Sequence, residues 1–443
     1  MTAVQLLHRF GAGSRSAEVV LCERSAGFTA GVAYGTRSEA HSLNVPAGRM
    51  SAYPDDRDHF LRWLRRKDPK AGGGSFIPRK LYATYLGDLL AEAEQSAGER
   101  ATLQRVIGSV RDLDVGADAV TVCLEDGRRL AVDRAVLAIG NFPPGNPSTE
   151  RPCFYQSPCY ARDPWADSAL DVDPDADVLL LGTGLTMLDI ALALHERGHR
   201  GAIHAISRRG LLPQPHRVSI KPPTAHPRPA ELDRWPRSVR GMLHALRGEA
   251  RRAAGRGVDW REVLTALRAD TPALWQGLSE PERRRFLRHL RPFWETHRHR
   301  AAPETAASIA EMIERRALHV SAGRVQRCLD RDDGVDVHWQ PRGAAPAELR
   351  VGRVINCTGP DTDLRRVAEP LIQSLRSRGQ LRPDALGLGL DSTPDGALVD
   401  ASGVASERLF LVGPLRKGLL WENTAVPELR VEAAQLAERL ARD

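Results

Sequence analysis

The sequence predicts an α/β protein with two Rossmann-like three-layer domains, β-meanders and a helical insertion. Three observations predict this fold: a strand–glycine turn–helix unit at residues 178–194, a β-meander that occurs twice, and an Arg-rich helical stretch over residues 230–318. The chain has 443 residues, enough for two or three domains. Its 42% hydrophobic and 27% charged residues are typical of a globular protein with a sizeable core.

The composition disfavours several classes of protein. No apolar run approaches the ~20 residues of a membrane span, and the N-terminus lacks the pattern of a signal peptide. The six cysteines form no CxxC pair, which disfavours a metal site or a dithiol redox centre and indicates a reducing, cytoplasmic location.

The net charge of +7 is interpreted as a solvated Arg-rich surface, with no nucleic-acid or membrane partner. One alternative is that part of this charge attracts an anionic cofactor or substrate. Another is that the helices of residues 230–318 bind nucleic acid.

The N-terminal third contains the first copy of the repeat. In chain order, its predicted elements are a helix at 1–14, a strand at 17–23, amphipathic helices at 59–66 and 81–96, and a β-meander at 105–140. The same meander pattern recurs at 324–359, and each copy closes on a buried strand followed by Gly140 or Gly359. A repeated meander of this kind predicts two related domains.

Residues 178–194 form the strongest local motif. An apolar run predicts a buried parallel strand, a Gly-Thr-Gly turn follows, and the remainder has helical spacing. Such a unit holds a dinucleotide pyrophosphate on backbone N–H groups at the helix N-terminus. The third glycine of the GxGxxG pattern is replaced by Met187, so the motif depends on its context. We predict cofactor contacts at Gly182, Gly184 and Thr186.

The strand after this unit, residues 202–206, indicates which dinucleotide binds. Its end, Ser207-Arg208-Arg209, is expected to face the adenosine ribose. An acidic residue there binds a ribose 2′-hydroxyl, whereas arginine suits a 2′-phosphate. Arg208 and Arg209 therefore predict NADP. The alternative is a purely structural βαβ unit with surface arginines.

Alignment of the two copies predicts a second ribose site. If Met1 is placed opposite Met187, Glu23 falls opposite Arg209 at the end of its strand. An acidic residue at that position suits the ribose of FAD. The counterpart of Gly182 would lie upstream of Met1, so the first strand and glycine loop of the FAD domain are absent. We expect a coding sequence annotated to start too late, with a decayed protein as the alternative.

The C-terminal segment adds a further cofactor signal. Gly413 follows a predicted core strand at 409–412, and a helix is expected from about Thr424 to Ala441. The N-terminus of that helix is partly positive and suits the flavin. Gly359 and Gly140, which end the two repeat strands, are expected to let the backbone approach the cofactors closely, and Gly413 is also predicted to contact a cofactor.

These elements predict a division of the chain into three parts. We predict an FAD-binding domain from residues 1–145 plus 352–443, an NAD(P)-binding domain from 172–229 plus 319–351, and a helical insertion at 230–318.

Segments that span nearly the whole chain resemble a known family. The chain is similar to FAD/NAD(P)-binding flavoproteins with two dinucleotide-binding domains, of the type found in a bacterial FAD-dependent urate hydroxylase and an aspartate N-hydroxylating monooxygenase. The more specific matches are LNVPAGRM within 31–64 and GPLRKGLLWENTAVPE within 413–430; further matches are 76–86, 178–217 and 355–360.

The resemblance implies an NADPH- and FAD-dependent monooxygenase that uses O₂ to hydroxylate a small polar metabolite. It places Asn44, Arg49 and Met50 at the flavin ring, with Arg49 also available to an anionic substrate. His216 and Arg217 are candidates for nicotinamide or substrate contact.

Several points stay open at the level of sequence. No catalytic residue or metal site is predicted, and the run HRHR at 297–300 is expected to be a solvated helix face. The alternatives to a monooxygenase are a flavin-dependent reductase or dehydrogenase, and a truncated NADPH-binding protein without FAD. The oligomeric state is not predicted.

Overall fold

The computed structural model describes residues 1–36, 38–218 and 226–442. Its largest sheet has seven strands in the order β12-β11-β10-β9-β8-β13-β7. These strands are β7 (Tyr160–Ala161), β8 (Val178–Leu181), β9 (Ile203–Ser207), β10 (Leu318–Arg331), β11 (Gly334–Pro341), β12 (Ala347–Val351) and β13 (Arg353–Asn356). Strands β10, β9, β8, β13 and β7 run parallel, and β10, β11 and β12 form an antiparallel meander.

The centre of this sheet is covered on both faces. Helices α5 (Leu185–Glu196) and α11 (Pro303–Glu314) pack against one face, and the meander with residues around Phe154 covers the other. All four residues of β8 are buried, which explains why this strand is a continuous apolar run rather than an alternating one. The predicted strand–turn–helix unit is thus β8 and α5.

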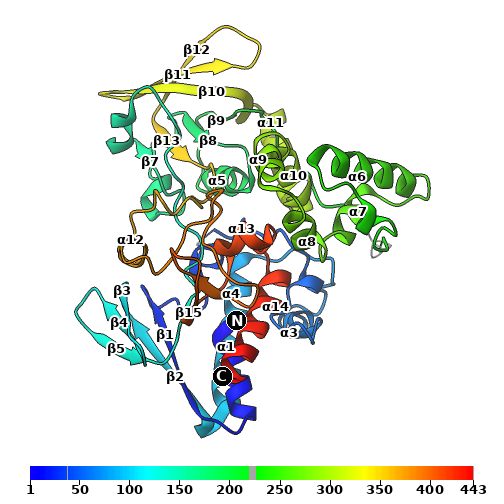
Figure 1. Cartoon of the computed structure of the whole chain (residues 1–443). Coiled ribbons are helices and arrows are strands. Elements are labelled where there is room, and N and C mark those ends of the chain that lie inside the picture. The colour runs from blue at the N-terminus through cyan, green and yellow to red at the C-terminus, as the bar shows by residue number, and fades with distance from the viewer. Residues whose placement is uncertain (37, 219–225, 443) are drawn as a thin grey trace.

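The other end of the molecule contains three smaller sheets (Figure 1). Their orders are β1-β2, β14-β15-β6 and β3-β4-β5. The strands are β1 (Ala17–Glu23), β2 (Ala101–Ile107), β3 (Val110–Val115), β4 (Val120–Leu124), β5 (Arg129–Val132), β6 (Ala135–Leu137), β14 (Ala397–Val399) and β15 (Ala405–Leu411). The parallel pair β1–β2 corresponds to β9–β10, and the meander β3–β5 leads to β6 as the second meander leads to β13. This correspondence agrees with the internal repeat.

A group of helices encloses the N-terminal core. Helix α1 (Thr2–Ala12) lies between α4 (Arg79–Ala97) and α14 (Val426–Arg442), so the two ends of the chain run side by side (Figure 1). Helix α3 (His59–Lys67) adds Phe60 and Trp63, which pack with Tyr82 and Tyr85 of α4. The aromatic residues whose spacing predicted amphipathic helices thus pack against one another in the N-terminal core.

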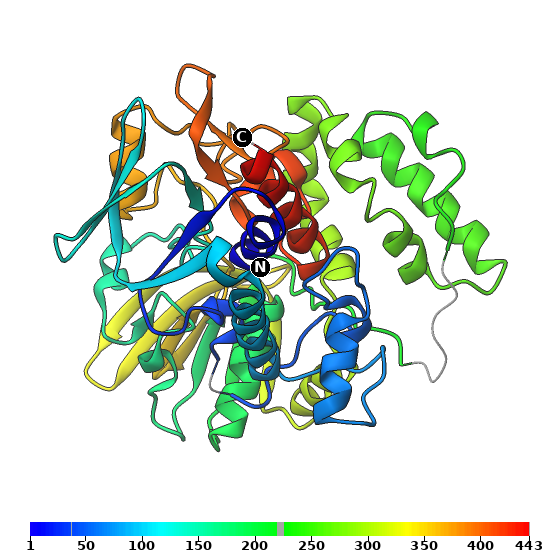
Figure 2. The same ribbon diagram turned by 90° about the horizontal axis from the view of Figure 1, so that it is seen from below.

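Residues 230–318 are mainly helical, and all their helices except α11, which packs on the large sheet, lie to one side of the sheets (Figures 1 and 2). The helices are α6 (Val239–Ala254), α7 (Trp260–Ala266), α8 (Thr271–Gln276), α9 (Glu280–His289), α10 (Arg291–Arg298) and α11. Two tryptophans join them to the C-terminal segment: Trp275 Nε1 donates to Gly418 O at 2.8 Å, and Trp294 Nε1 donates to Glu422 Oε1 at 2.7 Å. These bonds position the helices against the site described below.

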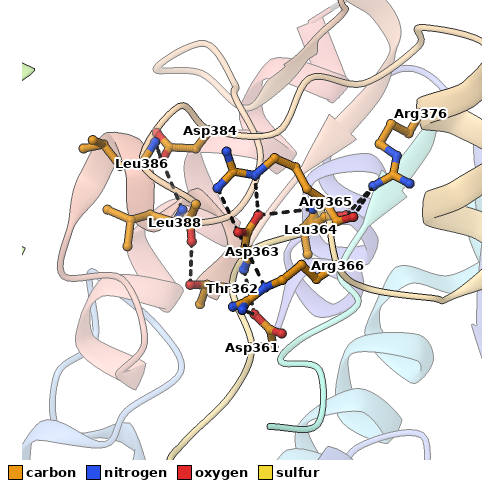
Figure 3. Close-up of polar contacts among 11 residues, drawn as sticks. Asp361, Thr362, Asp363, Leu364, Arg365, Arg366, Arg376, Asp384, Leu386 and Leu388 are labelled. Carbon is orange, nitrogen blue, oxygen red and sulfur yellow. Dashed lines mark hydrogen bonds and ion pairs between the residues drawn. The ribbon is translucent and has the colours of Figure 1, made fainter. Parts of the chain in front are cut away.

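Two chain segments, one after β6 and one after β13, connect the two ends of the molecule. Phe142 and Asp361 form an antiparallel bridge between them, and a side chain at Gly145 would place its Cβ 2.5 Å from Asp361 Oδ2. Figure 3 shows how the second segment is then held: Asp363 accepts from Arg365, and Arg376 donates to the carbonyl oxygens of Leu364 and Arg365. This bonding fixes the direction in which the chain leaves β13.

The model confirms the predicted fold class, with small shifts at element ends. The closing strand predicted at 135–139 is β6 (Ala135–Leu137), and the strand predicted at 409–412 is β15 (Ala405–Leu411). The last helix begins at Val426 rather than Thr424. Within the described part of the chain, no helix has the length and apolar character needed to cross a membrane.

The ion pair between Asp112 on β3 and Arg378 after helix α12 (Pro370–Ser377) makes a prediction about acid stability. Arg378 Nη1 donates to Asp112 Oδ2 at 2.9 Å, and this bonding lowers the pKa of Asp112 to about 2. The folded-state pKa lies below the usual 3.8, so this stability is present above pH 4 and is lost as the pH falls toward 2. Since both side chains are partly exposed, we expect Asp112→Asn to cost about 1 kcal/mol at pH 7.

The measurement is the free energy of unfolding of Asp112→Asn and the parent protein at pH 7 and at intervals below pH 4. The difference between the two proteins should shrink as the pH falls. Asp114→Asn, on the same strand but in a looser exposed pair with Arg129 at 3.8 Å, is the control and should change little. A difference that stays constant with pH would contradict the prediction.

Candidate functional site

The glycine turn after β8 has the geometry of a phosphate-binding loop. Gly182 has φ +113°, and a Cβ there would lie 2.6 Å from the carbonyl oxygen of Cys357 at the end of β13. A Cβ at Gly184 would meet nothing within 4 Å, so ligand atoms can approach the backbone there. Helix α5 has no side-chain N-cap, which leaves its first N–H groups available to an anion.

The end of β9 lies beside this turn. Thr183 Oγ1 and Ser207 Oγ are 2.8 Å apart, which joins the turn to the strand end that precedes the two arginines. Arg208 is exposed, and the Arg209 guanidinium lies 5.1 Å from the ring centre of Phe293 on α10. Among the described residues neither arginine has a carboxylate partner within 4.0 Å. Both groups are therefore free to bind a phosphate, and this end of the turn fits NADP.

A cavity of about 1300 Å³ lies next to this turn, and we call it the central cavity. It is lined by residues of α1, β1, β6, α5, α14 and the end of α10. Eight of the predicted cofactor residues line it: Glu23, Asn44, Arg49, Met50, Thr186, Gly359, Gly413 and Thr424. The other four, Gly182, Gly184, Arg208 and Arg209, lie outside its lining. Thr186 lines the cavity and lies in the first turn of α5, two residues after Gly184.

Strands β1 and β6 both line the central cavity. In the seven-stranded sheet, β8 lies between β9 and β13, but among the described residues no strand lies between their counterparts β1 and β6. No residue of β1 is fully buried, whereas every residue of β8 is. In the described part of the chain, no glycine turn of the Gly182 type stands at the cavity between β1 and β6.

The predicted flavin-ring end of the cavity is built by residues 44–50 and by His216. Met50 is 2% exposed, and Arg49 faces the cavity from the short turn before it. His216 packs on Phe76 and donates from Nε2 to the Asn44 carbonyl oxygen at 2.9 Å. Burial and the nearby Arg300 guanidinium lower the pKa of His216 to about 4, so its imidazole is neutral at pH 7.

The prediction of a solvated helix face at residues 297–300 is wrong for three of these four residues. Arg298, His299 and Arg300 line the central cavity, and Arg300 is only 7% exposed. Helix α10 ends at Arg298, and the chain then turns inward toward the cavity before α11. The following Ala-Ala-Pro sequence is the one local signal for that turn. Arg217, by contrast, is exposed and does not line the cavity.

The C-terminal segment also lines the central cavity. Gly413 has φ +98° with open space where a Cβ would be, and Asn423 Nδ2 donates to its carbonyl oxygen. Trp421 has φ +59°, which is uncommon for a bulky residue, and it is held by stacking on Trp275 at 4.7 Å. Strain of this kind concentrates at functional sites.

Sequence reasoning missed Glu422 as a site residue. It is 6% exposed, lines the cavity and accepts a hydrogen bond from Trp294. Burial opposes its ionisation, but His299, Arg298, the Trp294 hydrogen bond and Lys417 lower the pKa of Glu422 on balance. Only the packing of α10 against the C-terminal segment brings these charges together, so local sequence carries no signal for them.

Comparisons with known proteins agree with this architecture. Residues 1–142 match a family model described as FAD-NAD(P)-binding. Similar solved structures include the ornithine N-hydroxylase of Kutzneria sp. 744 with reduced FAD, NADP⁺ and L-ornithine (TM-score 0.63, 14% identity) and the ornithine hydroxylase of Pseudomonas aeruginosa (0.63, 14%). A third is L-lysine 6-monooxygenase of Pseudomonas syringae (0.59, 16%).

These alignments cover 100% of this chain and 96%, 96% and 97% of the other chains. A search of curated protein sequences finds no match. The predicted resemblance to flavoproteins with two dinucleotide-binding domains is thus confirmed at the level of fold.

Proposed function

We propose that this protein is a cytoplasmic, FAD- and NADPH-dependent monooxygenase that hydroxylates a small polar metabolite with O₂. The observation that carries the proposal is the placement of helix α5. Its phosphate-binding turn lies outside the central cavity, while Thr186 in its first turn lines the same cavity as Asn44 and Met50. A dinucleotide held on the turn can therefore reach a ring bound beside residues 44–50.

The FAD-NAD(P)-binding match of residues 1–142 supports the cofactor part of this proposal. The similar solved structures support the reaction, because they are hydroxylases or monooxygenases of ornithine and lysine. FAD, when bound, supplies the electron transfer from NADPH and the activation of O₂.

The chain's own residues are proposed to bind, orient and exclude water. Glu23, which lines the cavity, is proposed to bind the FAD ribose, and Gly359 and Gly413 are proposed to allow close backbone approach. Met50 and neighbouring buried side chains shield the ring end from solvent. Because the Asn44 carbonyl can only accept, His216 carries its proton on Nε2, and Nδ1 is available as an acceptor.

The deciding experiment is a spectrum and an oxygen balance on the purified full chain. After FAD reconstitution we expect a flavin absorbance spectrum, NADPH-dependent O₂ uptake, and a hydroxylated product from a panel of small amines, amino acids and carboxylic acids. Hydrogen peroxide equal to the NADPH consumed, with no product across the panel, would favour a reductase or oxidase. A colourless protein that binds NADPH would favour a nucleotide-binding protein without FAD.

NADPH selectivity gives a separate prediction. Replacing Arg208 and Arg209 together with alanine is expected to raise the KM for NADPH about tenfold and leave the KM for NADH unchanged, because only NADPH carries the 2′-phosphate. Initial rates with both nucleotides provide the measurement. Arg197→Ala, in an exposed pair with Asp171 at 3.6 Å on the same βαβ unit, is the control. Equal NADPH and NADH kinetics in the parent protein would contradict the role of both arginines.

A further inference from the structure

Four guanidinium groups gather at one end of the central cavity, and we call this end the cationic chamber. Its members come from three separate parts of the chain and all line the cavity: Arg49, Arg268, Arg298 and Arg300. Their charges interact. Burial and then the other arginines lower the pKa of Arg49 and of Arg300. The fold has thus brought like charges together at considerable electrostatic cost.

Acidic residues neutralise two of the four. Arg268 forms a two-pronged ion pair with Glu428. Arg298 lies 3.6 Å from Glu422 and 3.8 Å from Glu428. These pairs belong to the packing of the helical insertion against the C-terminal segment, and they explain why both arginines are tolerated there.

Arg49 and Arg300 have no such partner. In the part of the chain that the structure describes, no carboxylate oxygen lies within 4.0 Å of either guanidinium. Arg300 is 7% exposed, and among the described residues its Nε has no hydrogen-bond acceptor and its side chain makes one hydrogen bond, from Nη2 to Thr265 Oγ1 at 3.3 Å. Its pKa, although lowered to about 10, keeps it charged at pH 7.

The neighbouring groups do not cancel this charge. Burial lowers the pKa of His216 to about 4 and also lowers that of His299, and neither histidine supplies a negative counter-charge. Glu262 is the remaining nearby acid and raises the pKa of both arginines, but it lies beyond ion-pair distance. A buried, unpaired charge of this kind is costly unless a ligand supplies the counter-charge.

We propose that Arg49 and Arg300 bind a carboxylate of the substrate, so that the small metabolite hydroxylated here is a carboxylic acid. The planar guanidinium fork suits a carboxylate. This inference rests on the proposed function, and it adds the substrate class to it. The phosphates of NADP are another oxyanion source, but the phosphate-binding turn, Arg208 and Arg209 all lie outside the cavity that Arg49 and Arg300 line. The FAD pyrophosphate is the remaining one, and the test below includes FAD.

The test is calorimetric titration of the purified full chain with acetate, succinate and glutarate, and with neutral succinamide. We expect at least one of the three acids to bind, and succinamide not to bind. Arg300→Gln and Arg49→Gln should each weaken binding of that acid at least tenfold, and Arg300→Lys should weaken it less. Arg288→Gln, at an exposed position on α9, is the matched control and should bind as the parent does.

A second readout separates recognition from structural support. Arg300→Gln is expected to unfold at the same or a higher temperature without ligand, because it removes an unpaired buried charge. Three outcomes would overturn the proposal. The first is that none of the acids binds the parent protein, and the second is that Arg300→Gln and Arg49→Gln bind the acid as tightly as the parent does. The third is that Arg300→Gln weakens FAD or NADP⁺ binding as much as acid binding, which would assign the chamber to a cofactor phosphate. Carboxylate binding without a hydroxylated product would retain this site and remove the monooxygenase proposal.

Discussion

Alanine in place of Gly182 is expected to destabilise the protein by about 3 kcal/mol or more and to abolish NADPH binding. Two effects add. The φ of +113° is strained for any residue with a side chain, and the new Cβ would lie 2.6 Å from Cys357 O and 2.9 Å from Cys357 C. Both obstacles are backbone atoms at the end of β13, so no side-chain rotation relieves them.

Denaturant unfolding and NADP⁺ titration measure the two effects separately. Gly184→Ala is the matched control, because Gly184 has φ −86° and open space around the position of a Cβ. Its unfolding free energy should fall by less than about 1 kcal/mol, while its NADP⁺ affinity falls because the methyl group stands where the phosphate approaches. Similar stability of Gly182→Ala and the parent protein would show that the turn can relax away from β13.

Removal of the Glu432 carboxylate is expected to cost about 3–5 kcal/mol. Glu432 on α14 accepts from Arg416 Nη1 at 2.7 Å, and the two side chains are 7% and 4% exposed. Glu432→Ala would leave the Arg416 charge buried without a counter-ion. It would also remove the acceptor of the Gly413 N–H, which donates to Glu432 Oε1 at 3.2 Å, so the proposed FAD contact at Gly413 should loosen as well.

Thermal or denaturant unfolding of Glu432→Ala provides the measurement. Glu438→Ala lies on the same helix but in exposed pairs with Arg9 and Arg442, and it should change stability by less than about 0.5 kcal/mol. The double replacement Arg416→Met and Glu432→Leu should recover much of the loss, since well-packed apolar residues often substitute for a buried pair. Equal stability of the two alanine variants would indicate that Arg416 is satisfied by its backbone acceptors alone.

The predicted elements differ in how far local sequence determined them. The strand and helix around Gly182 were found because a buried apolar run, two glycines and helical spacing are adjacent in the chain. The meander repeat was found for the same reason, since alternation and turn residues are local properties. The ends of β6, β15 and α14 shifted by a few residues because pairing partners, rather than propensity, decide where a strand or helix stops.

Residues 297–300 show where such reasoning fails. The alternation of histidine and arginine there is compatible with a solvated helix end, and only the packing of α10 against Glu422 and Thr265 turns Arg298 and Arg300 into the cavity. Glu422 and Arg268 were missed for the same reason: each is unremarkable beside its sequence neighbours, and its partner lies far away in the chain.

By itself, the sequence determined the fold class, the repeated meander and the position of the glycine turn after β8, because each depends on residues that are close together along the chain. The tertiary structure alone decided which side chains share the central cavity and which charges in it remain unpaired. Burial and pairing of charge depend on segments more than 200 residues apart, such as Arg49 and Arg300, and no local pattern encodes that distance.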